Sequence, residues 1–405
     1  MTGRMDALML PLNWQRVRLG DIAEIKREAS PRPIENPKWF CANSNVGWVR
    51  ISDISKNSRF LYKTAQKLSK KGIEKSRFIK QNSLIMSMCA TIGKPIITKI
   101  DTCIHDGFVV FENPKIDLNY LYYFLCYIEK EWLESGQQGS QVNLNVDLIK
   151  NKEVFYPKDL NEQIAIANIL SDVDHYLCSL DALILKKESV KKALRIKMLN
   201  QILASNGVEF KKIGEICLIK RGRVIAKKIL QENGKYPVYS SQTLNNGILG
   251  FIDTYDFDGE FLTWITDGAY AGSVFYRNGR FSITNVCGLL QVIQDNILHK
   301  YLYYILQITA PLHVSSGMGN PKLMSAAMQQ IQIPLPPLNE QSAIANILSA
   351  LDKEIESLKN KKRQFENIKK ALNHDLMSAK IRVLKKIKIV LREVLCAIHA
   401  KRNRL

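Results

Sequence analysis

Two short stretches have residues whose types and spacing come close to a catalytic motif. "TIGKP" at residues 91–95 is similar to the end of a phosphate-binding loop, but it lacks the glycine five residues before Gly93, and Pro95 stands where Ser or Thr belongs. "NPKW" at residues 36–39 approaches the Asn/Asp-Pro-Pro-aromatic tetrad of amino-methyltransferases, but Lys38 replaces the second proline and no glycine-rich cofactor loop accompanies it. Neither stretch therefore predicts a nucleotide or methyl-donor site.

Combinations that could activate water or a nucleophile are also incomplete. Glu24 and Lys26 have the Glu-x-Lys form of many metal-dependent nucleases, but a similar segment later in the chain has Leu218 in place of the glutamate, which favours a solvated strand end. His105 and Asp106 could form a dyad, yet neighbours in a strand point to opposite faces and no third group is evident. The eight cysteines include no Cys-x-x-Cys pair and the six histidines do not cluster near them. We therefore expect no catalytic residue, no metal site and no cofactor in this chain.

The charge of the chain points to a polyanionic partner. The net charge is +20, from 58 Lys and Arg against 38 Asp and Glu, and residues 359–405 alone hold fifteen basic and three acidic residues. This balance favours nucleic acid ahead of a membrane surface, although a charge run can also be a solvated helix face. No signal peptide or bilayer-spanning apolar run is evident, and scattered cysteines suit a reducing compartment, so we expect a cytoplasmic protein.

Basic residues recur at equivalent places and could contact phosphates. The pair Lys26 and Arg27 corresponds to Lys220 and Arg221 in a second, similar segment. Such pairs suit phosphate contacts, which position a protein on a duplex, although solubilising surface charges would look the same. Polar, glycine-punctuated segments at residues 139–145, 264–272 and 317–322 could carry base contacts, although ordinary turns have the same composition. The residues that we predict to contact DNA are Lys26, Arg27, Lys94, Gln141, Asn143, Lys220, Arg221, Arg223, Thr266, Asp267, Asn320 and Lys322.

The sequence is a tandem repeat. "LNEQIAIANILSDVD" at residues 160–174 returns as "LNEQSAIANILSALD" at residues 338–352, with twelve of fifteen positions identical at an offset of 178. "LGDIAEIKR" is similarly followed by "IGEICLIKR", and "YLYYFL" by "YLYYIL". A weaker correspondence relates "IGKPII…CIHDGFVVF" to "AGSVFY…TNVCGLLQV". Because these features occur in the same order, we predict two copies of one structural unit.

Each unit is expected to end in a long helix with a narrow apolar seam. Apolar residues at alternating spacings of four and three predict a coiled-coil seam, and intramolecular pairing of the two helices, antiparallel, avoids the entropy of association. The alternative is that each helix packs on its own globular domain. The predicted seam comprises Ile166, Leu170, Val173, Leu177, Leu180, Ile184, Ile344, Leu348, Leu351, Ile355 and Leu358. The predicted helix-start and partner-docking residues are Asn161, Glu162, Gln163, Asn339, Glu340 and Gln341, with the two asparagines as N-caps.

The segments before the helices contain short alternating apolar runs bounded by Gly, Asn and Asp, which are typical of strands. These features predict an α+β fold: a tandem duplication of a mixed α/β domain plus a long helix, the two helices pairing as an antiparallel coiled coil in a dumbbell. We expect a first globular domain at residues 12–157, a helix at 158–205, a second globular domain at 206–337, a second helix at 338–378 and a basic amphipathic tail at 379–405.

At this point the chain resembles the specificity subunit of type I restriction-modification enzymes. The resemblance depends on "YPKDLNEQIAIANILSDVD" and "IPLPPLNEQSAIANILSALD", each opening a Lys-rich heptad helix, and on "LGDIAEIKRE" and "IGEICLIKRG" at the start of each domain. It implies a non-catalytic, prokaryotic protein whose two target recognition domains each read half of a gapped DNA target, while the coiled coil sets the gap. It also implies docking of two methyltransferase subunits, and restriction subunits through them, with S-adenosylmethionine, ATP and Mg²⁺ bound by those partners.

Two other classes of function stay open on the residues alone. A self-contained DNA-modifying enzyme is disfavoured by the missing motifs, and a coiled-coil scaffold that does not bind DNA would lack affinity in both domains. The tail at residues 379–405 departs from the repeat. Its amphipathic stripe carries nine basic residues and one acid, which predicts a continued or partner-docking helix ahead of a membrane-surface helix.

Overall fold

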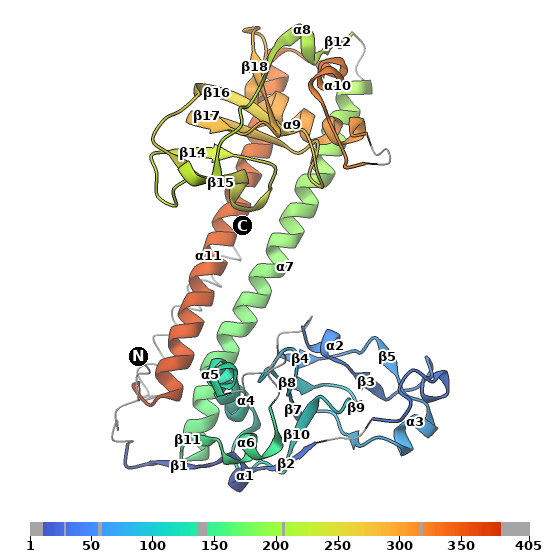
Figure 1. Cartoon of the computed structure of the whole chain (residues 1–405), viewed down its shortest axis with the longest axis vertical. Coiled ribbons are helices and arrows are strands. Elements are labelled where there is room, and N and C mark those ends of the chain that lie inside the picture. Colours follow the sequence, from blue (N-terminus) through green and yellow to red (C-terminus); the bar gives the residue numbers. More distant parts are fainter. Residues whose placement is uncertain are drawn as a thin grey trace. The chain divides into compact units, whose positions relative to one another are not determined.

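We describe residues 11–27, 30–55, 59–135, 144–204, 207–315 and 319–381 in a computed structural model (Figure 1). The chain divides into two compact units. Unit 1 comprises Met1–Ser179 and Lys362–Leu405, and unit 2 comprises Leu180–Lys361. Unit 1 therefore combines two segments that lie far apart in the sequence, whereas unit 2 is one continuous segment, and each long helix contributes one part to each unit. The predicted tail at 379–405 lies outside the described residues from position 382 onward.

The described residues of unit 1 form three β-sheets. The sheet that forms its centre has five strands in the order β2–β10–β7–β8–β4, and its strand residues are mostly buried on both faces. These strands are β2 (Glu24–Arg27), β10 (Phe108–Glu112), β7 (Leu84–Ser87), β8 (Pro95–Thr98) and β4 (Phe60–Leu61). The four-stranded sheet comprises β5 (Gln66–Lys67), β3 (Gly47–Val49), β9 (Thr102–Ile104) and β6 (Phe78–Ile79). The third sheet pairs β1 (Trp14–Arg18) with β11 (Glu153–Pro157).

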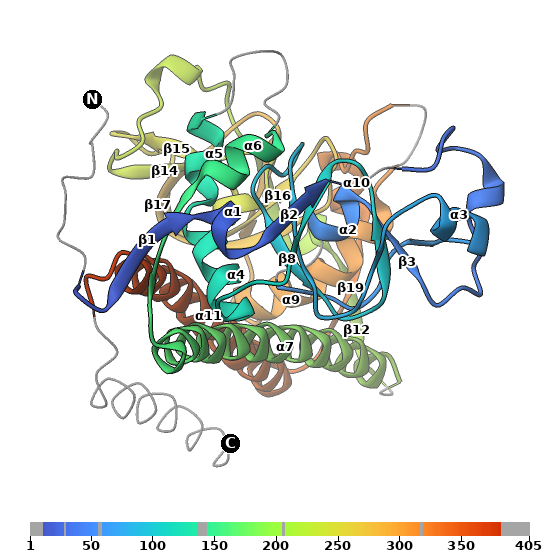
Figure 2. The same ribbon diagram turned by 90° about the horizontal axis from the view of Figure 1, so that it is seen from below.

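Short helices cover these sheets. The helix α4 (Leu118–Tyr127) is capped by Asp117, whose carboxylate accepts from the backbone N–H of Tyr120 (2.8 Å), and Figure 2 shows it lying against α7. The core of unit 1 includes aromatic residues of α4, such as Tyr123, together with Leu170 of α7. The other helices are α1 (Leu19–Ile22), η1 (Pro37–Trp39), α2 (Ile51–Ser55), α3 (Lys70–Glu74), α5 (Glu129–Ser135) and α6 (Val146–Asn151).

Unit 2 contains two β-sheets. The six-stranded sheet has the order β13–β18–β16–β17–β14–β15, in which only β14 and β17 pair in parallel. Its strands are β13 (Cys217–Arg221), β18 (Cys287–Val292), β16 (Phe257–Ile265), β17 (Val274–Ile283), β14 (Tyr236–Tyr239) and β15 (Ile248–Ile252). The second sheet pairs β12 (Glu209–Lys212) with β19 (Gln332–Leu335). The helices are α8 (Ile213–Ile216), η2 (Lys227–Ile229), η3 (Leu244–Gly247), α9 (His299–Thr309), η4 (Ala310–His313) and α10 (Ser325–Gln330).

The two units share one framework, which confirms the predicted duplication. In unit 1, β1, α1 and β2 follow one another, with β1 paired to β11 and β2 paired to β10. In unit 2, β12, α8 and β13 repeat this order, with β12 paired to β19 and β13 paired to β18. The strands outside this framework differ in number and order, so the two copies diverge most in the middle of each globular part.

The long helices α7 (Leu160–Ala204) and α11 (Leu338–Met377) pair antiparallel within each unit. In unit 1 the Tyr176 ring contacts the Phe365 ring, with centroids 4.5 Å apart, and Asp174 binds Lys369. The partner number on α11 rises from 365 to 369 as the number on α7 falls from 176 to 174. In unit 2, Lys187 binds Glu354 (2.8 Å) and Lys191 binds Asp352, which gives the same direction.

The predicted seam is inside the molecule. Eight of its eleven residues are buried, and Leu177, Leu351 and Leu358 are half-buried. The seam residues near each helix start also pack on the globular part of the same unit: Leu170 lies in the core with Tyr120, and Leu348 lies in the core with Tyr301. Pairing between helices and packing on the globular domain, which were alternatives on the sequence, therefore both occur.

The predicted N-caps need a correction of one to two residues. Helix α7 already includes Asn161, and the cap is Asp159, whose carboxylate accepts from the backbone N–H of Asn161 (2.9 Å). Helix α11 likewise includes Asn339, and the carbonyl of Pro337 accepts from the N–H groups of Glu340 and Gln341. The asparagines were chosen because asparagine is a strong N-cap residue, but Asp159 and Pro337 precede them and begin the helical hydrogen bonding first.

Candidate nucleic-acid interface

In unit 1 a set of backbone hydrogen bonds at the end of β7 holds several loops together. We call this set the frame. The N–H of Met88 donates to the carbonyl of Gly107 (2.8 Å), and the carbonyl of Met88 accepts from the N–H of Leu144 (3.0 Å). The loop that begins at Met88 closes where the N–H of Gly93 donates to the carbonyl of Ser87 (2.9 Å). Gly93 has a φ of 76°, a left-handed conformation that disfavours other residues. These bonds bring three separate loops together at one edge of the sheet.

Unit 2 repeats the frame at the end of β16. The N–H of Thr266 donates to the carbonyl of Val286 (3.0 Å), and the carbonyl of Thr266 accepts from the N–H of Leu323 (2.9 Å). The loop closes where the N–H of Gly272 donates to the carbonyl of Ile265 (2.9 Å), and Gly272 has a φ of 82°. The correspondence between "IGKPII…CIHDGFVVF" and "AGSVFY…TNVCGLLQV" is confirmed at Gly93 and Gly272, but in the second half the matching bonds pair Gly107 with Val286, which shifts the alignment of the two strings by two residues.

One arginine in each unit fastens a second loop of the frame. The side chain of Arg27 donates from Nε to the carbonyl of Asp106 (3.0 Å), and that of Arg221 donates from Nη2 to the carbonyl of Asn285 (2.6 Å). Both side chains are exposed, and a guanidinium has five N–H donors, so each can hold its loop and still offer donors to a phosphate. The predicted equivalence of these two arginines is therefore seen in their contacts.

The lysines before these arginines differ between the units. Lys26 lies between Glu24 and Glu112, with Nζ–Oε distances of 2.7 Å to each, and hydrogen bonds to these carboxylates raise the pKa of Lys26. A phosphate at Lys26 would have to compete with two carboxylates. Lys220 is exposed on β13. Among the described residues, the same position therefore carries a lysine without an ion pair in unit 2 and a lysine between two carboxylates in unit 1.

Three further predicted contact residues of unit 2 are exposed, and they differ in their contacts. Asn320 and Lys322 are exposed beside the loop that begins at Thr266, because an isolated bridge joins Asp267 to Lys322. Arg223 is exposed but its Nε binds both carboxylate oxygens of Asp256 (2.9 and 3.1 Å).

Thr266 itself requires a correction. Its side chain is completely buried, so it belongs to the frame beneath the loops and not to the surface that could contact DNA. The sequence suggested exposure because Thr266 opens a polar, glycine-rich segment, but the residue still completes the end of a buried strand. Asp267 and Lys94 are half-buried. Gln141 and Asn143 lie outside the described residues.

Two side chains in the frame loops were not singled out from the sequence. Arg32 is exposed and binds the carboxylate of Asp106 (2.5 Å), and Tyr270, 49% exposed, lies in the loop between Thr266 and Gly272. Exposed aromatic rings in such loops can stack on bases. The signal that could have found Tyr270 is its position between the paired glycines of the "TDGAYAG" segment.

The possible dyad of His105 and Asp106 is part of this loop. The strand β9 ends before His105, so the expectation that the two side chains point to opposite faces does not apply. Their side chains contact each other (Nδ1–Oδ1 2.7 Å), and the N–H of Gly107 also reaches Nδ1 of His105 (3.1 Å). Burial lowers the pKa of His105, which favours a neutral ring. These contacts shape a turn.

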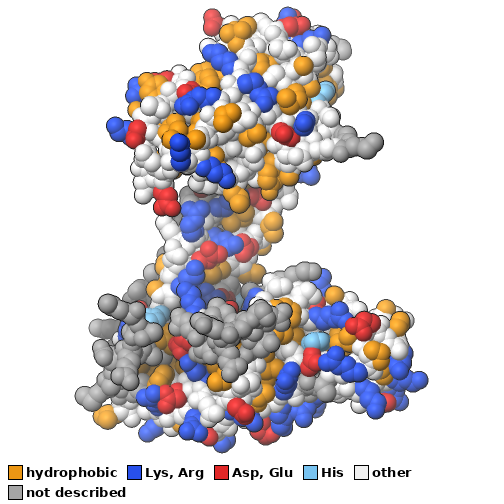
Figure 3. Space-filling view, viewed as in Figure 1, with side chains coloured by type: hydrophobic (Ala, Val, Ile, Leu, Met, Phe, Trp, Pro, Cys, Tyr) orange, Lys and Arg blue, Asp and Glu red, His pale blue; other side chains and the backbone are white. Residues whose placement is uncertain are grey.

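Figure 3 shows where charge gathers on one face of each unit. Lys and Arg side chains lie over the β14–β17 part of unit 2 and over the α3–β9 part of unit 1, with Asp and Glu side chains among them.

Within the described residues no group of His, Cys, Asp and Glu could hold a metal ion. None of the helices in that part of the chain combines the length and apolarity needed to cross a bilayer.

The repeated glutamine of each helix start has a structural role. Gln163 is buried, donates from Nε2 to the carbonyl of Pro157 (2.8 Å) and accepts at Oε1 from the N–H of Asp117 (2.8 Å). Gln163 therefore joins the start of α7 to the start of α4 and to the end of β11. A direct docking contact through this side chain, which the sequence suggested, is excluded because its polar atoms are already used inside the unit.

Gln341 makes the same joint in unit 2. It is buried, donates from Nε2 to the carbonyls of Pro336 (2.8 Å) and Asn296 (2.9 Å), and accepts at Oε1 from the N–H of Leu298 (2.9 Å). The prediction of docking through Gln341 is corrected for the same reason. Other helix-start residues remain at the surface: Asn161, Asn339 and Glu340 are exposed, and half-buried Glu162 accepts from Asn13 and Trp14.

A tyrosine, an aspartate and a lysine link the helices of unit 1. The hydroxyl of Tyr123 donates to Oδ2 of Asp174 (2.7 Å), and Nζ of Lys369 lies 2.5 Å from Oδ1 of the same carboxylate. This set, which we call the unit 1 clamp, ties α4 to both long helices. Burial and the neighbouring carboxylate raise the pKa of Tyr123, so its hydroxyl remains a donor.

The unit 2 clamp repeats this set with the roles of the long helices exchanged. The hydroxyl of Tyr304 donates to Oδ2 of Asp352 (2.7 Å), and Lys191 binds Oδ1 of the same carboxylate. Asp352 occupies the repeat position of Asp174, and Lys191 that of Lys369. The doubled Tyr-Leu-Tyr-Tyr segment was the signal for the tyrosines.

The outer faces of the long helices carry exposed apolar side chains. On α7 the most exposed is Leu185, at 64%. Others on α7 and α11 are Ile164, Val190, Ile196, Leu203, Ile347 and Ile368. Among the described residues, these side chains are therefore apolar surface on the long helices.

Comparison with known proteins agrees with this architecture. The chain matches the family model described as "Type I restriction modification DNA specificity domain" twice, over residues 11–187 and 205–367. It is 46% identical over 142 residues to the "Type I restriction enzyme MpnII specificity subunit" of Mycoplasma pneumoniae, a match that covers 35% of this chain and 43% of that protein. It is 51% identical over 138 residues to the N-terminus of another type I specificity subunit of that organism, covering 34% of this chain and 74% of that sequence.

Solved structures share the fold. The crystal structure of a type I restriction-modification system S subunit from M. genitalium superposes with a TM-score of 0.63 at 17% identity, over 92% of this chain and 98% of that one. A structure of the type I system described for complex assembly and conformational transition gives a TM-score of 0.56 at 17% identity, over 91% and 98% of the two chains. At this identity the likeness concerns the fold.

Proposed function

The chain belongs to the family of type I restriction-modification DNA specificity subunits, and from this premise we propose that it selects the DNA sequence on which its complex acts. Each unit would read one half of a two-part target separated by base pairs that are not read. The observation that carries this proposal is the repeated frame, which presents loops of different sequence in the two units on identical backbone bonds. Two similar readers with different loops suit two different half-sites.

Within each unit we assign positioning and reading to different residues. The exposed guanidinium groups of Arg27 and Arg221 would contact phosphates next to the frame, and Lys220 would add to them in unit 2. The loops that follow Met88 and Thr266 would carry the base contacts, with Asn320 and Lys322 beside the second loop. Phosphate contacts would set the position of each unit, and loop side chains would choose among sequences.

The long helices would set the gap between half-sites. At about 1.5 Å per residue, the 45 residues of α7 span about 68 Å and the 40 residues of α11 about 60 Å. Both lengths exceed one turn of B-DNA, about 34 Å, so helices of this length could hold two readers at least one turn apart. The clamps would fix the register of the pairing.

Catalysis would belong to partner subunits. We propose that two adenine methyltransferase subunits, carrying S-adenosylmethionine, dock on the outer faces of the long helices through side chains such as Leu185, Ile196 and Ile347. Restriction subunits that use ATP and Mg²⁺ would join through the methyltransferase.

Modified-base sequencing of the host genome, with and without this gene, tests the proposal. We expect loss of adenine methylation at one motif made of two short blocks with a fixed gap. A Lys322→Ala substitution should change the preference in one block and leave the other intact. Methylation that persists without the gene would contradict the proposal, and turnover by the purified chain alone would favour a self-contained enzyme.

A further inference from the structure

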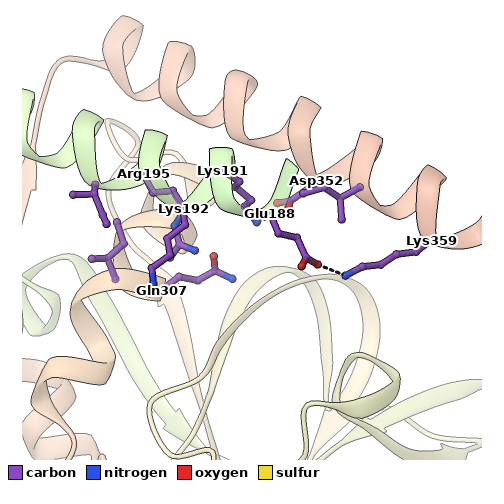
Figure 4. Close-up of a pocket in the computed structure, with 10 residues that line it drawn as sticks. Glu188, Lys191, Lys192, Arg195, Gln307, Asp352 and Lys359 are labelled. Atoms are coloured by element: carbon purple, nitrogen blue, oxygen red, sulfur yellow. Dashed lines mark hydrogen bonds and ion pairs between the residues drawn. The ribbon is translucent and has the colours of Figure 1, made fainter. Parts of the chain in front are cut away.

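Unit 2 contains a cavity of about 480 Å³ between α7, α11 and the end of α9. Figure 4 shows the side chains of Arg195, Lys192 and Gln307 together at one end of it, with Glu188, Asp352 and Lys359 towards the other. The residues come from both long helices and from α9, so the cavity is formed where three helices of one unit meet. A volume of this size is within the range of small-molecule sites.

The cavity has an excess of positive charge. Four cationic residues, Lys191, Lys192, Arg195 and Lys359, line it, against two carboxylates. Lys191 binds Asp352, and Lys359 binds Glu188 (2.7 Å). Within the part of the chain that the structure describes, Lys192 and Arg195 form no ion pair, so the lining has a formal charge of +2.

Two polar atoms at this end of the cavity lack a partner in the described part of the chain. Nε of Arg195 and Oε1 of Gln307 are buried and have no hydrogen-bond partner among the described residues. Burial lowers the pKa of the Arg195 guanidinium, which records the cost of removing its charge from water. An arginine stays protonated at neutral pH, and an anion bound beside the guanidinium would offset this cost further than Asp352 already does.

The matching place in unit 1 shows that the helix scaffold does not require this charge. The repeat places Lys370 at the position of Lys192 and Asn373 at the position of Arg195. Lys369, Glu366 and Asp174 match Lys191, Glu188 and Asp352, so these five positions have a formal charge of 0 in unit 1 and +1 in unit 2. The difference is Arg195, whose place in unit 1 is taken by the neutral Asn373.

The same place in unit 1 also holds two rings. Tyr127 and His374 occupy the repeat positions of Ile308 and Ile196, and their ring centroids lie 5.5 Å apart. Unit 2 has smaller, aliphatic residues there. Two differences therefore coincide in unit 2: the side chains at these positions are smaller, and an arginine replaces an asparagine.

We propose that this cavity of unit 2 binds a phosphate group, held by Arg195 and Lys192. A phosphate dianion matches the formal charge of +2, and the planar guanidinium suits two phosphate oxygens. Lys191 would remain with Asp352 in the unit 2 clamp, and the phosphate would be held by Arg195 and Lys192. Both of these residues belong to α7, and the cavity that receives the phosphate is completed by α11 and α9. The inference stands apart from DNA reading, since it needs neither the frame loops nor a target sequence.

Calorimetric titration of the full chain with inorganic phosphate, at constant ionic strength, tests the site. We expect saturable binding that weakens about tenfold or more in Arg195→Asn, as for loss of a charged hydrogen bond. Asparagine is the residue that unit 1 already has at this place, and a second variant, Lys192→Ala, changes a surface position that folding tolerates. Lys370→Ala, the matched change in unit 1, should bind phosphate like the unaltered chain.

Parallel titrations with a nucleoside monophosphate and a short DNA duplex identify the source of the phosphate. Competition by the duplex that Arg195→Asn abolishes would assign the site to a DNA phosphate, and tighter binding of the nucleotide would assign it to a small molecule. Absence of saturation below about 10 mM, weaker than a Kd that a specific site would have, would overturn the inference. Equal binding by Arg195→Asn and the unaltered chain would overturn it as well.

Discussion

Replacing Gln341 by leucine keeps a side chain of similar size but removes all three of its hydrogen bonds. The N–H of Leu298 and the carbonyls of Asn296 and Pro336 would lose their partner. The first two bonds are partly buried, so water can replace part of them at a cost of about 1 kcal/mol each, and the buried bond to Pro336 costs about 2 kcal/mol. The added apolar burial of leucine returns about 1 kcal/mol. We therefore expect unit 2 to lose about 3 kcal/mol of its free energy of unfolding.

Native-state hydrogen exchange is the suitable assay because it follows each unit separately. The amide of Leu298 and those of the first turn of α9 should exchange about a hundredfold faster in Gln341→Leu, while amides of unit 1 keep their protection. Asn339→Ala, an exposed change in the same helical turn, is the control and should shift stability by less than about 0.5 kcal/mol. A loss below about 1 kcal/mol, with unchanged exchange in α9, would refute the assignment of Gln341 as the joint.

Four further outcomes are expected. Gly272→Ala should destabilise unit 2 by about 1–2 kcal/mol in thermal unfolding, because φ is 82°, and an unchanged Tm would contradict this. Asp352→Ala removes the carboxylate that Tyr304 and Lys191 share and should lower the free energy of unfolding in urea by about 2 kcal/mol. Asp352→Asn should give a value between those of Asp352→Ala and the unaltered chain. Burial raises the pKa of Cys217 to about 12, so at pH 8 its thiol stays protonated and should react with a thiol reagent only after unfolding, whereas exposed Cys41 should react at once. Arg221→Ala should reduce the slope of log K for DNA against log salt by about one, and an unchanged slope would limit this side chain to holding its loop.

The helical part of the fold could be predicted because its signal is periodic and duplicated. Seam residues such as Leu170 and Leu348 are buried as expected, since an apolar stripe at heptad spacing can hardly be placed elsewhere. The partner of that stripe could not be decided, because the same residues serve both the second helix and the globular core. Periodicity identifies the apolar face of a helix, but it does not identify the segment that packs on that face.

The candidate interface was harder to predict from composition. Arg27 and Arg221 were correctly paired by the repeat, but their bonds to loop carbonyls depend on strand register, which the sequence does not display. Thr266 was misplaced because a polar segment was assumed to be exposed from its first residue. Lys26 looked like its repeat partner Lys220, although only Lys26 has carboxylates on both sides.

The glutamine joint has a consequence for how such chains can diverge. Gln163 and Gln341 contact backbone groups of the neighbouring segments, and those groups belong to different residue types in the two units, Asp117 in one and Leu298 in the other. A joint that uses only N–H and C=O groups is indifferent to the side chains around it. The globular parts can therefore accumulate substitutions, or be exchanged whole, without loss of their attachment to the long helices, as long as the glutamine and the local path of the backbone persist.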